Sequence, residues 1–420
     1  MKKIRQCAGL LTGLLLLSCS DVDKTVDKSI IDVAGAMENL REMKVSQLGN
    51  KIKFVPLETN DSVLVDNLWN LLVTDKYVIV SNIGHGGNQK CMTFDLNTGK
   101  YIATVGHRGQ DPEAYAYSVP FLDQAENDEL YFPKRTGLVK YSMDGRFLGA
   151  INSTIMNYRL CSFPLLTDTV MTGVLAESSP EGDRCISLLR MNLEGNLIDS
   201  IVVVPGKSIN PNVHRMYSNA SIQRVPSLMP YSGLEFSKIS GWLEDKSQVV
   251  DIIGPNQMWQ TGGSIRFHQA FNDSIYDMTA EGTPIIYVFD TGKWRYPVEK
   301  IGKMEITSDH VFVTDVTETP DKIVFAVSKG WFGEDNKGYV GLYDKKTRAT
   351  TMGKIEKGFQ DDLAGFAPFY PVRTNSKGQL IGVLTMESIN NWIEKHPDAE
   401  RPAFLDTLAD DANPVLVVVE

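Results

Sequence analysis

The chain has 420 residues, a formal net charge of −10, and 42% apolar and 9% aromatic residues. This acidic balance, with no basic stripe, argues against nucleic acid as a partner. The apolar fraction can fill a large core, and the length allows either several small domains or one large repeat architecture.

A signal peptide is predicted at the N-terminus. Three basic residues among the first five precede an apolar run at residues 10–17, which is too short to span a bilayer. The run ends in Leu16, Leu17, Ser18 and Cys19, which resembles the lipobox of bacterial lipoproteins. That resemblance implies cleavage before Cys19 and a lipid anchor on its thiol. An ordinary secretory signal cut elsewhere and an uncleaved anchor remain the alternatives.

The residues after Cys19 indicate an outer-membrane lipoprotein. Residues 20–24 are acidic and resemble the export signal of surface-displayed lipoproteins, while the periplasmic and cell-surface faces both stay open. Loss of residues 1–18 would change the net charge from −10 to −13, and no later apolar run reaches the roughly 20 residues that a membrane helix needs. We therefore expect a signal peptide (1–18), a lipidated tether that is partly helical near its end (19–45) and a folded domain (46–420).

Three cysteines remain after the signal peptide and the acylated residue are set aside. They are Cys91, Cys161 and Cys185, in a compartment that permits disulfides. At most one pair can form, and Cys161 with Cys185 is the pair we consider, because both lie on strands expected in one unit. Three buried thiols are an equally good interpretation.

From about residue 46 the sequence predicts β-strands almost throughout, as short β-rich runs separated by Gly, Asn and Asp turns. Helix signals are few. The best is at residues 386–396, where Ile389, Trp392 and Ile393 follow helical spacing.

A repeat is visible when the turns are aligned on Gly99, Gly145 and Gly195, which lie 46 and 50 residues apart. Each copy reads as a strand, a tight polar turn and a second strand, which is typical of the outer hairpin of a propeller blade. About fifty residues make one four-stranded blade. We therefore predict an all-β, six-bladed β-propeller of antiparallel blades, the fourth carrying an insertion, with blades at 64–115, 118–155, 156–204, 205–295, 300–353 and 358–420.

The two ends of the folded domain predict how the ring closes. Residues 51–57 form an isolated early strand, and residues 414–419 form a final one. A propeller that places its first and last strands in one blade leaves no frayed sheet edge. We expect these two segments to share a sheet.

A family resemblance covers nearly the whole mature chain. Residues 54–58, the turn at 94–95 that leads into 105–115, and Glu318-Thr319 before a strand resemble six-bladed β-propeller lipoproteins of diderm gut bacteria, which are relatives of NHL-type propellers. The sequence departs from the usual pattern at Asp111, where a second glycine is common. The resemblance implies an exported binding or accessory protein and supplies no catalytic residues.

Enzyme motifs are missing from the sequence. It contains no Gly-x-Ser-x-Gly elbow, His-Glu-x-x-His pair, Walker loop or complete EF-hand. We therefore expect no catalytic residues and no resident metal or cofactor, although a divalent cation is left open. His85 in a Gly-rich loop fits a simple turn better than a ligand site.

The loop that contains His107 and Arg108 is the first candidate binding site. It follows an outer strand and leads into the next blade, so that Arg108 could hold a carboxylate or a sugar acid. A purely structural crossover is the favoured alternative, because two glycines accompany the loop.

Aromatic residues give the second candidate. Trp331 and Phe332 lie between glycines and could stack on a sugar ring or on a partner, and Trp259 and Tyr231 are weaker examples. Packing between blades explains these residues equally well.

Two classes of function follow. The first is a non-catalytic binding or interaction module, anchored to the membrane through Cys19, that offers loops to a glycan, a peptide or an envelope partner. The second is a propeller hydrolase or lyase acting on a sugar or lactone, with a metal or carboxylate site at the central channel. We favour the non-catalytic class.

Overall fold

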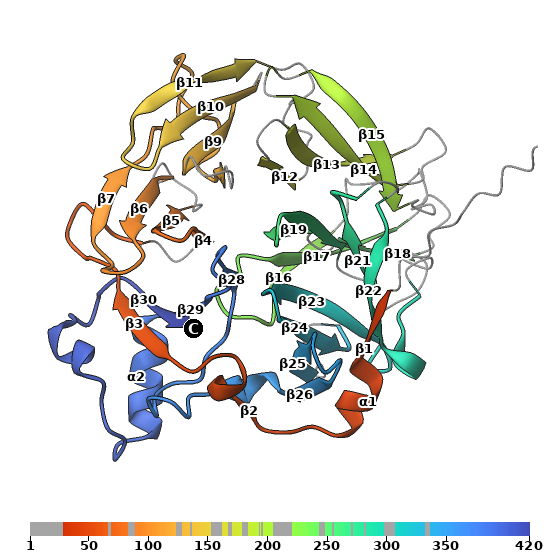
Figure 1. Cartoon of the computed structure of the whole chain (residues 1–420), viewed down its shortest axis with the longest axis vertical. Coiled ribbons are helices and arrows are strands. Elements are labelled where there is room, and N and C mark those ends of the chain that lie inside the picture. Colours follow the sequence, from red (N-terminus) through yellow and green to blue (C-terminus); the bar gives the residue numbers. More distant parts are fainter. Residues whose placement is uncertain are drawn as a thin grey trace, which may run out of the picture.

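The computed structural model shows a ring of β-sheets around a central axis (Figure 1). The chain is a β-propeller, and its sheets are built mainly of antiparallel strands. The structure describes residues 28–65, 69–82, 89–122, 128–134, 137–152, 162–166, 170–178, 184–192, 194, 196–204, 221–242, 248–253, 256–269, 272–280, 283–297, 307–331 and 337–420.

Five sheets have four antiparallel strands each within the described residues. The first three agree with the blades expected at 64–115, 118–155 and 156–204. Their strands are β4 (Trp69–Val73), β5 (Tyr77–Asn82), β6 (Cys91–Asp95) and β7 (Tyr101–Thr104); β8 (Phe121–Leu122), β9 (Glu129–Lys134), β10 (Gly137–Ser142) and β11 (Phe147–Asn152); and β12 (Ser162–Leu166), β13 (Val170–Ser178), β14 (Arg184–Asn192) and β15 (Leu197–Val204).

The fourth and fifth four-stranded sheets complete the C-terminal half of the ring. One contains β23 (Val311–Glu318), β24 (Lys322–Lys329), β25 (Lys337–Asp344) and β26 (Thr350–Lys354). The other has the order β28 (Arg373–Thr374), β29 (Leu380–Leu384), β30 (Val415–Val419) and β3 (Ile52–Pro56). The antiparallel pairing of β3 with β30 confirms that the segments 51–57 and 414–419 share a sheet.

The predicted count of six four-stranded blades is not confirmed. Residues 205–295, expected to form one blade with an insertion, contribute seven described strands, which is enough for two sheets. One sheet has three strands and the other has four, joined at its edge by β1 (Ser29–Asp32) as a fifth. The strands are β16 (Ser221–Pro226), β17 (Glu235–Trp242) and β18 (Gln248–Ile253), then β19 (Asn256–Thr261), β20 (Ser264–Gln269), β21 (Ser274–Asp277) and β22 (Ile285–Asp290).

The N-terminal segment corrects the expected tether. Strand β1 pairs in parallel with β22, and the six-residue helix α1 (Val33–Glu38) follows it directly. Ile31 and Val33 are fully buried against Phe289 and Val313. Strand β2 (Met43–Lys44) then pairs with β27 (Phe359–Gln360), so residues 29–45 belong to the folded body because their apolar side chains are needed in its core.

The helix expected near the C-terminus is present as α2 (Met386–Lys395). Thr385 caps it by accepting a hydrogen bond from the Ser388 backbone N–H, and Ile389 is fully buried. Four short 3-10 segments are also described, namely η1 (Val45–Gln47), η4 (Gly292–Trp294), η6 (Ile355–Lys357) and η7 (Ala403–Thr407). None of the helices in the described part of the chain has the length and apolar character needed to span a bilayer.

The inner strands of the four-stranded sheets and of the sheet of β19 to β22 contact one another around the axis. Strand β8 contacts β12, β12 contacts β19, β19 contacts β23, β23 contacts β28, and β28 contacts β4. The buried apolar side chains fill the spaces between neighbouring sheets. Polar side chains on the inner strands therefore come together from segments that are far apart in the sequence.

The cysteine prediction is tested only in part. Cys91 is a free, fully buried thiol, and burial raises its pKa to about 12, which leaves it unreactive. Cys161 lies outside the described residues, and the side chain of Cys185 is not described either. The pairing of these two residues stays a prediction.

A glycine turn explains why the repeat is visible in the sequence. Gly99 ends the turn between β6 and β7 with φ of +71°, and the Asp95 carboxylate accepts hydrogen bonds from the backbone N–H groups of Asn97 and Thr98. A Cβ at Gly99 would lie 1.8 Å from the carbonyl oxygen of Pro56. Conformation and space therefore both require glycine here.

Substitution Gly99→Ala should lower the free energy of unfolding by about 2–4 kcal/mol, since the left-handed conformation costs about 1–2 kcal/mol and displacement of Pro56 adds to it. The matched control is Gly262→Ala, where φ is +53° and no atom lies within 4 Å of the added Cβ. Urea unfolding of both variants separates the cost of the left-handed conformation, which both share, from the cost of displacing Pro56, which only Gly99→Ala has. Equal losses would mean that the contact with Pro56 is of no consequence.

Candidate functional site

Backbone hydrogen bonds hold the loop between β7 and β8 in place. The Tyr115 N–H donates to the His107 carbonyl oxygen at 3.0 Å, and the Gly109 N–H donates to the Tyr115 carbonyl oxygen at 3.2 Å. The Ala116 N–H donates to the Pro133 carbonyl oxygen of β9 at 2.8 Å, which fixes the loop to the next sheet. The exposed part of the loop therefore lies on a rigid base.

Buried aromatic residues support the same loop from below. The Tyr115 ring stacks on Phe132 with ring centres 4.6 Å apart. The Tyr141 hydroxyl donates to the Glu113 carbonyl oxygen at 2.6 Å, and Gly106 takes φ of +60° where a Cβ would meet the Tyr141 ring. The structural interpretation of the glycines in this loop is thus correct for Gly106.

Asp111, where the family pattern commonly has glycine, organises the turn with its side chain. Its Oδ1 accepts hydrogen bonds from the backbone N–H groups of Glu113 and Ala114, at 3.1 and 3.0 Å. Its Oδ2 lies 2.7 Å from His107 Nε2, and this contact is the main reason that the pKa of Asp111 lies below its usual range. The His107 side chain thereby has a partner inside the loop.

Arg108 is exposed beside this pair. Among the described residues, no side chain or carbonyl group forms a hydrogen bond or ion pair with its guanidinium. Tyr117, eight residues beyond Gly109, is 53% exposed in the same connection. The loop thus offers a cation and an aromatic ring to solvent on a fixed backbone, an arrangement suited to holding a ligand with a carboxylate and an apolar face.

The second predicted pair is described only in part. The Trp331 ring is partly buried and stacks on Phe312 of β23, with ring centres 6.4 Å apart. This contact favours the packing interpretation of Trp331. Phe332 lies outside the described residues, and its role stays a prediction.

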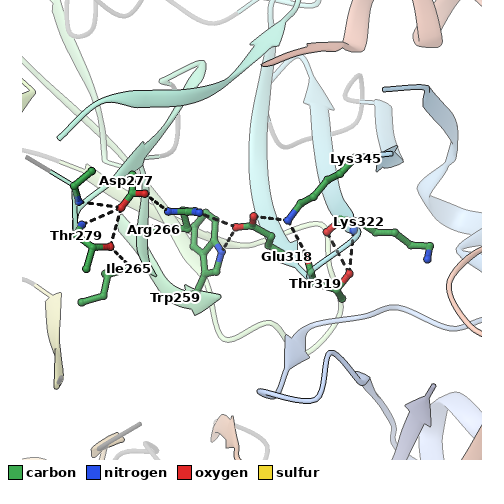
Figure 2. A network of polar contacts seen from close by, with 10 residues as sticks. Trp259, Ile265, Arg266, Asp277, Thr279, Glu318, Thr319, Lys322 and Lys345 are labelled. Atoms are coloured by element: carbon green, nitrogen blue, oxygen red, sulfur yellow. Dashed lines mark hydrogen bonds and ion pairs between the residues drawn. The ribbon is translucent and has the colours of Figure 1, made fainter. Parts of the chain in front are cut away.

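Trp259 of β19 takes part in a polar network that joins two neighbouring sheets (Figure 2). Its indole N–H donates to Glu318 Oε2 at 2.7 Å, and Glu318, at the end of β23, is 1% exposed. Lys345 Nζ lies 2.6 Å from Glu318 Oε1 and also donates to the Thr319 carbonyl oxygen at 2.7 Å. The carboxylate is therefore held by partners from two segments that are far apart in the sequence.

The network continues into the sheet of β19 to β22 through Arg266. Its Nε lies 3.8 Å from Glu318 Oε2, and its Nη1 lies 2.7 Å from Asp277 Oδ2. Burial raises the pKa of Asp277, but hydrogen bonds from Thr279 and the charge of Arg266 outweigh this and leave the pKa lowered. Burial and the nearby Glu318 raise the pKa of Tyr287 to about 12. The indole N–H of Trp259 is therefore used to hold Glu318 and to join the two sheets, which is a structural role.

A second polar cluster joins two inner strands to the connection between β16 and β17, and we call Asp315, Arg373, Ser227 and Ser232 the axial cluster. Asp315 of β23 is 4% exposed, and its Oδ2 accepts hydrogen bonds from the hydroxyls of Ser227 and Thr314. Burial raises the pKa of Asp315, although these bonds and the charge of Arg373 oppose the rise. Its Oδ1 has no hydrogen-bond partner among the described residues.

Arg373 connects three parts of the molecule. Its Nε donates to the Leu71 carbonyl oxygen of β4 at 2.7 Å, Nη1 donates to the Val372 carbonyl oxygen at 2.6 Å, and Nη2 donates to that of Ser232 at 2.8 Å. Burial lowers its pKa to about 10, so it stays charged at neutral pH. The axial cluster therefore fastens the connection between β16 and β17 to the inner strands, and a hydrogen bond of 2.8 Å between Tyr231 and Thr385 adds to it.

Sequence reasoning missed the axial cluster and the network around Glu318. A trace of the first exists in the sequence, because Asp315 interrupts the apolar run of β23. Its partner Ser227 is 88 residues away, and Ser232 is 141 residues from Arg373. Within the described ranges, no three His, Cys, Asp or Glu side chains are grouped so that they could hold a metal ion.

Comparison with known proteins supplies a family. A family model described as a domain of unknown function, DUF4934, matches residues 28–420. The chain belongs to the DUF4934 family. This match begins one residue before β1 and so agrees with the inclusion of the N-terminal segment in the fold of the DUF4934 chain. No curated protein matches it.

One solved structure is similar in fold. A candidate exported protein of Bacteroides fragilis is 15% identical with a TM-score of 0.63, and the match covers 93% of the DUF4934 chain and 99% of that protein. A DUF4221 family member from Bacteroides vulgatus is 9% identical with a TM-score of 0.41, covering 88% and 96%. The β-propeller domain of the Trilobed protease from Pyrococcus furiosus is 8% identical with a TM-score of 0.33, covering 76% and 91%. At these identities the first match bears on fold alone, and the other two are too distant to carry an argument.

Proposed function

We propose that the protein is an exported, outer-membrane lipoprotein whose NHL-like propeller is a non-catalytic binding module. The anchor is the lipidated Cys19, and the binding surface is the loop between β7 and β8. The observation that carries the proposal is the exposed guanidinium of Arg108 on a loop whose backbone is fixed by hydrogen bonds and buried aromatic residues. A rigid base lowers the entropy cost of binding, so a small contact surface can still be selective.

The ligand class that fits this loop first is an anionic oligosaccharide. The Arg108 guanidinium can bind a sugar carboxylate in a bidentate manner, and the exposed Tyr117 ring can cover an apolar sugar face. Acidic peptides and envelope proteins can also present carboxylates and apolar groups to Arg108 and Tyr117. They should be tested as ligands together with the oligosaccharides. The alternative of a hydrolase or lyase at the channel gains no support from the axial cluster, where Asp315 is held by serine and threonine hydroxyls.

Substitution Arg108→Ala should weaken binding of an oligogalacturonate by about ten- to a hundred-fold, since a hydrogen bond to a charged group contributes about 1.5–3 kcal/mol. Isothermal titration measures the dissociation constant of the mature chain. The matched control is Arg401→Ala, an exposed arginine near η7, which should leave affinity unchanged. Binding that is equal in wild type and Arg108→Ala would place the ligand elsewhere.

A thermal-shift screen precedes the titration. A ligand present at a hundred times its dissociation constant stabilises the fold by about 2.7 kcal/mol. Acidic oligosaccharides should raise the melting temperature while neutral ones of the same length should not. A shift with calcium that EDTA reverses would favour the alternative of a metal-dependent site.

A further inference from the structure

The segment nearest the proposed anchor is docked on the outer edge of the ring. Strand β1 forms the edge of its sheet through parallel pairing with β22, and α1 packs against β22, β26 and η4 (Figure 1). Ile31 and Val33 are fully buried there. We call the surface formed by β1, α1 and η4, together with the adjoining Leu40 and Lys329, the N-terminal rim.

The number of residues between Cys19 and the described part of the chain limits how far this rim can lie from an anchor on Cys19. Lys28, the first described residue, is only nine positions after Cys19. At about 3.3–3.6 Å per residue, nine residues in any conformation reach at most about 30 Å. Because residues 29–45 are part of the fold, they add nothing to this reach.

The surface chemistry of the rim suits a lipid headgroup region. Ile30 is 48% exposed and Leu40 is 38% exposed, although both are large apolar residues. The partly buried Trp294 ring lies between two ammonium groups, with Lys293 Nζ and Lys329 Nζ each 4.7 Å from its centre. Tryptophan rings and lysine stems favour the boundary between apolar chains and water.

Acidic residues at the rim are already engaged. The Glu38 carboxylate pairs with Lys293 at 3.1 Å, and the Asp32 carboxylate accepts the Gly35 N–H at the start of α1. The Asp290 carboxylate accepts the Gly292 N–H. The ion pair of Glu38 with Lys293 reduces the repulsion that an anionic surface would otherwise exert on the rim.

We propose that the N-terminal rim rests on the lipid surface that holds the acyl chains of Cys19, so that the ring stands on its edge. This inference rests on the anchoring included in the proposed function. Strand β7, which precedes the loop with Arg108, and strand β9, to which Ala116 of the same connection is hydrogen-bonded, lie across the ring from β1 and α1 (Figure 1). The loop therefore points away from the membrane, where a large extracellular or periplasmic ligand can reach it.

Quenching of tryptophan fluorescence tests this orientation on the acylated full chain in phosphatidylcholine vesicles. Lipids brominated in their acyl chains should quench the wild-type protein, and Trp294→Phe should remove most of that quenching. The control is Trp392→Phe, which replaces another partly buried tryptophan, in α2, on a different side of the ring. Mass spectrometry of the N-terminal peptide establishes acylation of Cys19 in every sample.

A second variant keeps the test independent of the packing of Trp294. The double substitution Ile30→Glu and Leu40→Glu changes two exposed side chains and should reduce quenching without lowering the melting temperature. An acylated protein whose quenching is the same in both variants as in wild type would overturn the orientation alone. A chain with no acyl group on Cys19 would overturn the anchoring and, with it, the orientation.

Discussion

Substitution Glu318→Gln is expected to lower the free energy of unfolding by about 3–5 kcal/mol, because it removes one partner of a buried ion pair. The carboxylate is 1% exposed and lies 2.6 Å from Lys345 Nζ. Glutamine has the same shape and can still accept the Trp259 indole N–H, but it leaves the charge of Lys345 without compensation. Urea unfolding at neutral pH measures the loss.

Two controls separate charge from packing. Glu38→Gln breaks an ion pair whose side chains are 58% and 68% exposed, and it should change stability by no more than about 1 kcal/mol. The double variant Glu318→Gln with Lys345→Met should recover part of the loss, since the charges of the buried carboxylate and of the partly buried ammonium are then both removed. A loss below about 1 kcal/mol in Glu318→Gln would contradict the view that this network joins the two sheets.

The parts of the fold that sequence predicted correctly depend on local signals. The turn of Gly99 has a positive φ, and so does Gly145 in the next sheet, because each hairpin needs a residue without a side chain at that point. Periodicity within a hairpin therefore located most sheets to within a few residues. Closure of the ring by β3 and β30 was predicted from a general rule, since an unpaired edge strand is a hazard in any propeller.

The errors arose where tertiary contacts decide the outcome. Residues 205–295 form two sheets, but only the hairpin near Tyr276 retains a trace of the repeat, so their number could not be counted from spacing. Residues 20–45 begin with a polar, acidic stretch, which suggested a spacer. Apolar residues of the later part, such as Ile31 and Val33, are nevertheless buried by partners about 250 residues away in sequence, which no local pattern reveals.

In the candidate site, too, the sequence predicted what depends on neighbouring residues and missed what depends on distant contacts. The loop with Arg108 was selected because glycines and charged residues follow an outer strand, and this combination is visible in a single stretch of sequence. The network around Glu318 was not predicted, since Trp259 is 59 residues away and Lys345 is 27 residues away. Trp259 was selected as an aromatic residue, and only its partner reveals that the indole N–H has a structural role.

Acid should destabilise the fold through His268, a fully buried residue of β20. Burial lowers its pKa to about 4 from 6.5, although a contact of 3.2 Å between its Nδ1 and the Ser274 carbonyl oxygen opposes the shift. The folded state keeps the ring neutral against Phe289, while the unfolded chain binds a proton below pH 6.5. Stability from this group is therefore complete above about pH 6.5 and decreases as the pH falls toward 4.

Between about pH 7.5 and about pH 4.5, wild type should lose about 2.5 kcal/mol of unfolding free energy through His268, since a tenfold difference in proton affinity between the folded and unfolded states corresponds to about 1.36 kcal/mol. Carboxylates such as Asp111 and Asp277, whose pKa values are lowered, add their own acid sensitivity, so the comparison must be with a variant. His268→Phe retains these carboxylates and removes the imidazole. Urea unfolding of both proteins should give two pH profiles that differ by this amount. Parallel profiles would mean that the buried imidazole is protonated in the folded state as readily as in the unfolded chain.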